Sequence, residues 1–188
     1  MPLVEEDRQF LLSLARQTIT SVLEGREPQE VDLNCVSEDL RRPGASFVTL
    51  TIGGELRGCI GSIEPRRPLV LDVQENAIAA AFHDPRFPPL SRRELDRTHI
   101  EISVLTVPQP LNYEGPADLL AKLRPGVDGV IIERGWQRAT FLPQVWEKLP
   151  DPCEFLEHLC LKACLAPNDY RRSGLRVYTY QVEKFEET

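Results

Sequence analysis

The sequence SFVTLTI (residues 46–52) is followed by GG (53–54) and then by ELRGCIGSI (55–63). Two runs rich in apolar and β-branched residues around a two-glycine turn predict a β-hairpin, because glycine accepts the positive φ angles of such turns. Alternate side chains of a strand point to opposite faces. Regular alternation therefore places Arg57, Cys59 and Gly61 on one face. The apolar, core-facing side then carries Leu56, Gly58 and Ile60.

Arg57 and Cys59 form the first candidate site of the chain. A guanidinium two residues from a thiol, on the same face, favours the nucleophilic thiolate, and Gly61 leaves that face open. Glycines within a strand otherwise weaken it unless a bulge or a close backbone approach requires them. The alternative is structural: Gly58 and Gly61 relieve crowding in a twisted hairpin, and Cys59 is a small buried hydrophobe. Both interpretations stay open at this point.

The overall charge argues against a general nucleic-acid binder. The 29 acidic and 22 basic residues give a net charge of −7, whereas binding to phosphates needs a positive surface. Two basic pairs, Arg92-Arg93 and Arg171-Arg172, are candidates for a local patch. Nucleic acid is therefore not an expected partner.

The N-terminal residues, the lack of a long apolar run and the cysteines lead us to expect a cytoplasmic protein. The first residues, MPLVEEDRQF, are acidic and lack a signal peptide's basic start and apolar core, and no apolar run is long enough to span a bilayer. Five cysteines are an odd number in 188 residues, which does not match a disulfide framework, so free thiols are expected.

Strand and helix patterns alternate along the chain, and two strand connections read as hairpins. This order favours an α+β fold with a mainly antiparallel sheet flanked by helices over a doubly wound parallel sheet. We expect a single domain over residues 1–188, with a larger and a smaller α/β lobe. Helices are expected at 5–24, 68–83, 117–123, 143–149 and 151–165, with a further short helix at the capping box of residues 91–94. Further strands are expected at 98–107, 127–132, 137–142 and 175–185.

The stretch LRGCIGSIEP (residues 56–65) resembles the signature of the AMMECR domain, the A component of the AmmeMemoRadiSam system. The resemblance continues in order through DPRFPPL (84–90), EISVL (101–105), FLPQV (141–145) and the segment 155–163. It implies the fold described above, but no settled reaction. The resemblance also implies two partners, a Memo-like protein and a radical-SAM protein. Their genes are found beside those of the family, which suggests a shared modification pathway.

Three further residues are expected near Cys59. Asp84 and Arg86 lie in a proline-rich loop after a helix, and loops held by rigid elements often carry function. Glu101 lies mid-strand between apolar residues, facing either solvent or a polar cavity. The structural alternative for Asp84 and Arg86 is a salt bridge within the turn. His83 and His99 are the histidines nearest in sequence, but nothing places either at Cys59.

A second cluster contains Cys153, Cys160 and Cys164, which are expected on one helical face, and His158, which points elsewhere by helix geometry. Core packing is the favoured interpretation of these cysteines. A zinc site usually draws short Cys/His pairs from separate segments, and no second pair is present. We expect no metal. Walker, dinucleotide-binding, HExxH and GxSxG motifs are absent from the sequence, so we expect no cofactor.

Two functions follow from these residues. The favoured hypothesis is a binding or partner module that uses the LRGCIG face to hold a small ligand or a protein segment, with Arg57, Gly58, Gly61, Asp84 and Arg86 as binding residues. The alternative is a thiol-dependent enzyme in which Cys59 is the nucleophile and Glu101 a general base.

Overall fold

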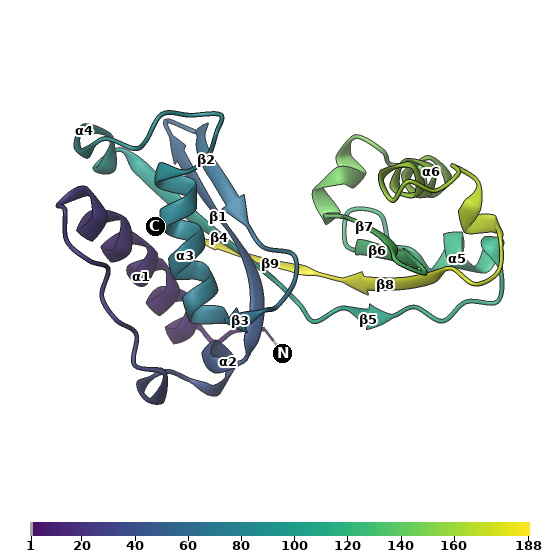
Figure 1. Ribbon diagram of the computed structural model, residues 1–188, viewed down its shortest axis with the longest axis horizontal. Helices are drawn as coiled ribbons and strands as arrows, with labels where there is room; N and C mark the ends of the chain where they lie inside the picture. The colour runs from purple at the N-terminus through teal and green to yellow at the C-terminus, as the bar shows by residue number, and fades with distance from the viewer. Residues whose placement is uncertain (1) are drawn as a thin grey trace. The chain divides into compact units, whose positions relative to one another are not determined.

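The computed structural model describes residues 2–188 and separates them into two compact units (Figure 1). Unit 1 contains residues 2–105 and 183–188, and unit 2 contains residues 106–182. Antiparallel sheets and helices occur in both, so the prediction of an α+β fold is confirmed. The helices between residues 2 and 188 all lack the combination of length and apolar character that crossing a bilayer requires.

The sheet of unit 1 runs in the order β2-β1-β4-β9, and β3 pairs with the start of β1. The predicted hairpin is present: β1 and β2 pair around Gly53 and Gly54, whose φ angles of 60° and 83° match the two-residue turn expected there. The strands are β1 (Pro43–Ile52), β2 (Glu55–Gly61), β3 (Arg67–Pro68), β4 (Thr98–Leu105) and β9 (Val182–Glu186).

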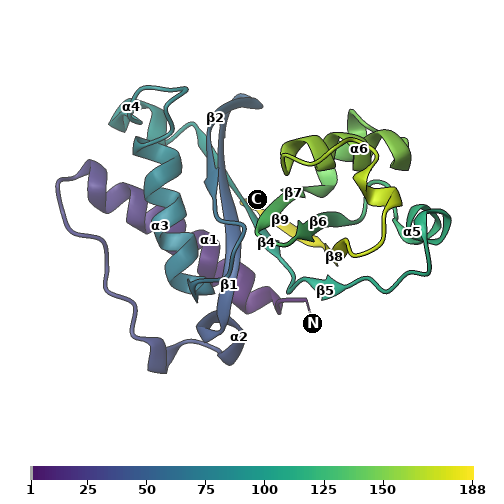
Figure 2. The ribbon, with the colours of Figure 1, turned by 45° about the vertical axis from the view of Figure 1, so that its right-hand side comes forward.

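Two helices, α1 (Glu5–Leu23) and α3 (Leu69–Phe82), cover one face of this sheet (Figures 1 and 2). The alanines of α3 allow a close approach: Ala77, Ala80 and Ala81 are buried against the strands. On β1, Val48 and Leu50 are fully buried, so they mark the helix-covered face. Short helices η1 (Leu33–Cys35), α2 (Glu38–Arg41) and α4 (Arg92–Leu95) complete unit 1.

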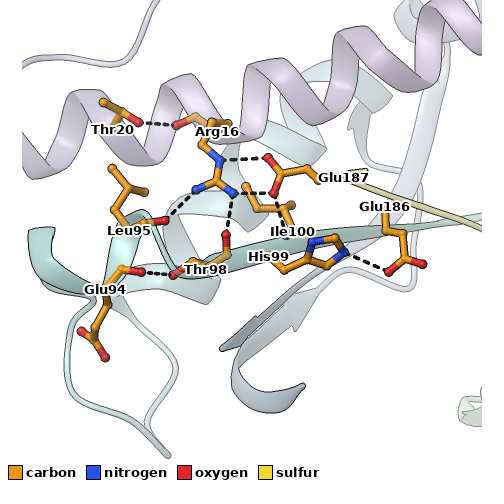
Figure 3. A network of polar contacts seen from close by, with 9 residues as sticks. All are labelled: Arg16, Thr20, Glu94, Leu95, Thr98, His99, Ile100, Glu186 and Glu187. Carbon is orange, nitrogen blue, oxygen red and sulfur yellow. Dashed lines mark hydrogen bonds and ion pairs between the residues drawn. The ribbon is translucent and has the colours of Figure 1, made fainter. Parts of the chain in front are cut away.

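Arg16 joins α1 to the C-terminal segment (Figure 3). Its guanidinium donates to the Leu95 carbonyl at 2.9 Å, to the Thr98 carbonyl at 2.7 Å and, through Nε at 2.9 Å and Nη2, to the Glu187 carboxylate. The same carboxylate accepts from the backbone N–H of Ile100 at 3.0 Å. One guanidinium therefore holds α1, the start of β4 and the end of the chain together.

The sheet of unit 2 has the order β5-β8-β6-β7. Its core face carries Val130 and Ile132, which pack with Leu119, Trp146 and Phe155 from the helical segments. The elements are β5 (Gln109–Pro110), α5 (Pro116–Lys122), β6 (Gly129–Arg134), β7 (Gln137–Phe141), η2 (Pro143–Glu147), α6 (Pro152–Lys162), η3 (Asp169–Arg171) and β8 (Arg176–Tyr180).

The chain enters and leaves unit 2 through adjacent segments. The backbone N–H of Thr106 donates to the Gln181 carbonyl at 2.8 Å, and the Gln181 N–H donates to the Thr106 hydroxyl oxygen at 2.8 Å. These bonds hold together the first and the last segment of unit 2, directly after β4 and directly before β9.

Several element boundaries differ from the predictions. The predicted last strand, residues 175–185, is divided at Gln181 into β8 and β9, which belong to different sheets. Helix α6 ends at Lys162 instead of about Leu165, because Cys164 adopts a left-handed φ of 60°. The predicted helix at 143–149 is a 3₁₀ turn, η2, which begins at a proline.

Candidate functional site

A β-bulge in β2 determines where the side chains of the LRGCIG stretch point. Thr51 lies opposite Leu56 and Leu50 lies opposite Gly58, so Arg57 has no partner on β1. An extra residue of this kind resets the alternation of a strand. Leu56 accordingly lies on the open face with 42% of its surface exposed, instead of on the core as predicted.

Arg57 turns to the helix-covered side of the sheet. It is only 8% exposed, and its Nε donates to Glu94 Oε1 at 2.8 Å on α4, which lies beside α3 (Figures 1 and 2). Its Nη2 donates to the Pro88 carbonyl at 2.9 Å. The expectation that Arg57 shares a face with Cys59 is therefore wrong, and the reason is the bulge.

Phe87 supplies a further contact for the Arg57 guanidinium, whose Nη1 is buried without a hydrogen-bond partner among residues 2–188. The guanidinium carbon lies 5.8 Å from the centre of the Phe87 ring, within the range of a cation–π contact. The Arg86 guanidinium lies 5.6 Å from the same ring. The Phe87 ring thus lies near both Arg57 and Arg86, the two arginines that the sequence analysis named as binding residues.

Cys59 lies in a polar row on the open face of the sheet. It is opposite Thr49, and Thr49 is opposite Glu101 on β4. The Cys59 sulfur lies 3.2 Å from the Thr49 hydroxyl, and the thiol is partly accessible. Glu101 is 3.5 Å from Lys184 Nζ on β9. Cys59 and Glu101 therefore lie on either side of Thr49 in one cross-strand row, and Lys184 is the charged neighbour of the Glu101 carboxylate.

Asp84 and Arg86 cover the free edge of β2. The Asp84 carboxylate accepts from the Cys59 backbone N–H at 2.9 Å, and Arg86 Nη2 donates to the Cys59 carbonyl at 3.2 Å. Arg86 also donates hydrogen bonds to both Asp84 carboxylate oxygens, from Nε to Oδ1 at 2.9 Å and from Nη2 to Oδ2 at 2.7 Å. The structure thus brings these residues to Cys59, but through its backbone. Such a cover protects an edge strand from pairing with another chain.

Hydrogen bonds to arginine keep both nearby carboxylates ionised. Those from Arg86, together with the Cys59 backbone N–H, hold the pKa of the nearly buried Asp84 well below its usual range. Those from Arg57, with Ser91, lower the pKa of Glu94 to about 2. A carboxylate with so low a pKa is a weak proton acceptor at neutral pH.

The two motif glycines have packing roles. A Cβ added at Gly58 would lie 2.1 Å from the Ala80 carbonyl oxygen, so α3 can approach β2 only because this position is glycine. A Cβ at Gly61 would lie 2.3 Å from the Phe47 ring. Both distances are far inside van der Waals contact, so the close approach of neighbouring groups accounts for both residues.

A buried carboxylate near the hairpin escaped the sequence analysis. Asp72 Oδ2 accepts from the Ser46 N–H and hydroxyl at 2.9 and 2.7 Å, from the Ser62 hydroxyl at 2.7 Å and from Asn76 Nδ2 at 2.9 Å. The cluster fastens the first turn of α3 to β1 and to the end of β2. Its only sequence signal was the placement of Asp72 and Asn76 one helical turn apart.

The second cysteine cluster is dispersed. Cys160 is fully buried in the core of unit 2, but Cys164 lies beyond the end of α6 and is exposed. The prediction that Cys153, Cys160 and Cys164 share a helical face is therefore wrong for Cys164. Between residues 2 and 188, no three His, Cys, Asp or Glu side chains converge as metal ligands would.

Comparison with known proteins identifies the relatives of this chain. The family model of AMMECR1 matches residues 12–185. The chain belongs to the AMMECR1 family. A protein of Methanothermobacter thermautotrophicus is 43% identical over 187 residues, which cover 99% of this chain and 97% of that protein. A protein of Thermofilum pendens is 41% identical over 198 residues, covering 97% and 91%.

A solved structure supports the AMMECR1 fold. The uncharacterized protein PH0010 from Pyrococcus horikoshii is 37% identical and superposes with a TM-score of 0.75, over 95% of this chain and 90% of that one. The resemblance first seen in the LRGCIG stretch thus extends over nearly the whole chain.

Two residues of the site were missed by sequence reasoning, Glu94 and Thr49. Glu94 had a signal, because Ser91-Arg92-Arg93-Glu94 is a capping-box pattern, and its carboxylate does accept from the Ser91 N–H at 2.8 Å. Its second role, as the partner of Arg57, depends on the β-bulge, and the local sequence does not predict this bulge. Thr49 could have been found only from the hairpin register.

Proposed function

We propose that this AMMECR1 protein is a binding module that holds a segment of a partner protein on the surface formed by β2 and residues 84–90. The observation that supports the proposal is that the charged groups near Cys59 are already paired with one another. Arg57 is paired with Glu94, Asp84 with Arg86, and Glu101 with Lys184. The alternative, a thiol enzyme, needs Glu101 as its general base, but Thr49 lies between Glu101 and Cys59, and the Glu101 carboxylate is paired with Lys184 at 3.5 Å.

The proposed surface extends around the free edge of β2 and carries side chains of the kind found at interfaces. Leu56 is exposed on β2, while Phe87 and Arg86 lie in the adjoining loop. Apolar and arginine side chains often act as anchors at interfaces. The bonds between Asp84, Arg86 and the Cys59 backbone hold the loop in place before a partner arrives, which reduces the entropy lost on binding.

The family resemblance supplies the partners of this proposal: a Memo-like protein and a radical-SAM protein, as components of one modification pathway. The test is a pull-down with the purified Memo-like and radical-SAM proteins of the source organism. We expect wild type to retain at least one of them and Leu56→Asp to lose it. Val127→Asp is the matched control, because Val127 in unit 2 is 45% exposed against 42% for Leu56.

Failure of wild type to retain either protein would reject the partners, and equal losses in the two variants would reject the surface. The same protein tests the alternative, an enzyme with Cys59 as nucleophile. Alkylation of Cys59 is followed against pH. A midpoint well below the ordinary thiol value of about 8.5 would favour the enzyme, and an ordinary midpoint supports the binding module.

A further inference from the structure

Unit 2 contains a cavity of about 750 Å³ that lies apart from the LRGCIG surface. Its walls are residues 110–116, which lead from β5 into α5, and residues 170–178, which lead from η3 into β8. Pairing of the two segments, Gln109 opposite Thr179 and Pro110 opposite Tyr178, forms one end. The volume is in the range of small-molecule sites, about 300–1,000 Å³.

The cavity walls are positively charged in a protein whose net charge is −7. Arg171, Arg172 and Arg176 line it, with Glu114 as the acidic residue of the lining. Guanidinium groups recognise phosphate through paired N–H donors, and they do so better than lysine. A cluster of three is therefore suited to a phosphate group.

The carboxylates near these arginines each pair with two guanidinium groups. Asp169 accepts from Arg172 Nη1 at 3.3 Å and also from Arg134. Glu133 pairs with Arg176 at 3.1 Å and with Arg138 at 3.2 Å. The lining itself carries three guanidinium groups and one carboxylate, Glu114, so its own charge is positive.

Arg171 has a neutral hydrogen-bond partner, and the Glu157 carboxylate lies near enough to interact with its charge. The Arg171 Nε donates to the Tyr170 hydroxyl at 3.1 Å, and its guanidinium carbon is 5.4 Å from the Tyr170 ring. These contacts fix the direction of the side chain. A guanidinium held in one direction is suited to the recognition of an anion.

Tyrosine rings form the apolar part of the lining. Tyr113 is held by a hydrogen bond of 2.7 Å from its hydroxyl to the Leu175 carbonyl, and Tyr178 lies on β8 opposite Pro110. The Tyr113 ring, held by its hydroxyl, offers a face on which a planar group can stack. The lining therefore combines anion recognition with ring recognition.

We propose that this cavity binds a small phosphorylated ligand with a planar ring, such as a nucleoside monophosphate, with Arg171 and Arg172 at the phosphate and the tyrosines at the ring. The site is independent of the β2 surface. The volume of about 750 Å³ favours a small molecule over a nucleic-acid strand.

The test is isothermal titration of the full chain with AMP, adenosine and inorganic phosphate. We expect one AMP to bind per chain, and adenosine and phosphate each to bind at least tenfold more weakly. Arg171→Gln and Arg172→Gln should each weaken AMP binding at least tenfold. The control with the same charge change, Arg92→Gln in unit 1, should leave the affinity within twofold.

A second measurement keeps the proposal falsifiable if the Arg171 variant folds poorly. Arg176 has 62% of its side chain exposed, so Arg176→Gln is expected to fold, and it should also weaken AMP binding. Absence of AMP binding at 5–10 mM, or equal losses in Arg172→Gln and Arg92→Gln, would overturn the site. A tenfold preference for a single-stranded hexanucleotide over AMP would overturn the assignment to a small ligand.

Discussion

Arg57 and Glu94 meet through two hydrogen bonds, Nε to Oε1 at 2.8 Å and Nη2 to Oε2 at 3.3 Å. This fork joins the bulge of β2 to helix α4 and directs the guanidinium away from the Cys59 thiol. The residues of the LRGCIG stretch therefore have separate roles: Arg57 forms a partly buried ion pair, Gly58 and Gly61 allow close packing, and Cys59 has a partly accessible thiol.

Replacing Glu94 should destabilise the fold. Glu94→Gln keeps the size of the side chain but leaves the nearly buried Arg57 guanidinium without its counter-charge. Fully buried pairs lose about 3–5 kcal/mol on such a change and exposed pairs up to about 1 kcal/mol. Glu94 is partly exposed, so we expect a loss of about 2 kcal/mol in a urea titration.

Arg92→Gln is the control for that titration. Arg92 lies on the same helix, α4, and its ion pair with Glu24 is exposed. Its loss should be within about 0.5 kcal/mol, as for most surface changes. Equal effects of the two variants would mean that the Arg57–Glu94 pair adds little to stability.

Acid should weaken the protein through Glu94. In the folded state its pKa is about 2, below the ordinary value of 4.5, so the folded protein binds fewer protons in that interval than the unfolded one. The contribution is fully present above about pH 4.5 and is lost as the pH falls toward 2. The lowered pKa of Asp84 acts in the same direction below its ordinary value of 3.8.

Urea titrations between pH 7 and pH 2.5 measure this dependence. Glu94→Gln and Asp84→Asn should each reduce the slope of the unfolding free energy against pH below about pH 4.5. A slope unchanged in both variants would contradict the assignment of lowered pKa values to these carboxylates.

Gly58 should not tolerate a methyl group. In Gly58→Ala the added carbon meets the Ala80 carbonyl of α3, so helix and strand must move apart. Overpacking of this kind costs about 1–3 kcal/mol. Thermal unfolding of Gly58→Ala against Leu56→Ala, an exposed position on the same strand, measures the effect. Equal midpoints would show that α3 shifts without cost.

The thiols should differ in reactivity. Cys160 is fully buried, and burial raises its pKa, whereas Cys35 and Cys164 are exposed. A hydrogen bond to the Asp32 carboxylate raises the pKa of Cys35. Timed alkylation at pH 8 with peptide mass spectrometry should therefore label Cys164 first, then Cys35, and Cys160 last. Asp32→Asn should speed the reaction of Cys35 and leave that of Cys164 unchanged.

Arg16 should be required to hold the C-terminal segment. Arg16→Leu leaves the Glu187 carboxylate and two backbone carbonyls without their donor, which costs about 1–3 kcal/mol for the buried groups. Amide hydrogen exchange at Ile100 and Glu187 should accelerate in this variant. Gln17→Leu, an exposed change on the same helix, is the control, and equal exchange in both would contradict the role of Arg16.

The sequence allowed the hairpin to be predicted because glycine pairs, β-branched runs and alternation are local signals. The helices 5–24 and 68–83 were predicted within a residue or two of α1 and α3 for the same reason. The division of the last strand at Gln181 could not be predicted, because its alternation continues through the point where the chain changes sheets.

The candidate site was predictable only in part. Asp84 and Arg86 were expected near Cys59, and they do meet it, but at its backbone. The face of Arg57 was predicted wrongly, since a single unpaired residue inverts the pattern on which the prediction rested. A bulge depends on the pairing of two strands, so one strand's sequence does not contain it.

The bonds between Thr106 and Gln181 mean that residues 106–182 leave and rejoin the polypeptide at neighbouring points. Because its two ends are adjacent, this segment could be deleted and residues 105 and 183 joined by a linker of a few residues, without stretching β4 or β9. Each unit could then be produced as a separate polypeptide, so the two proposed sites could be assayed one at a time.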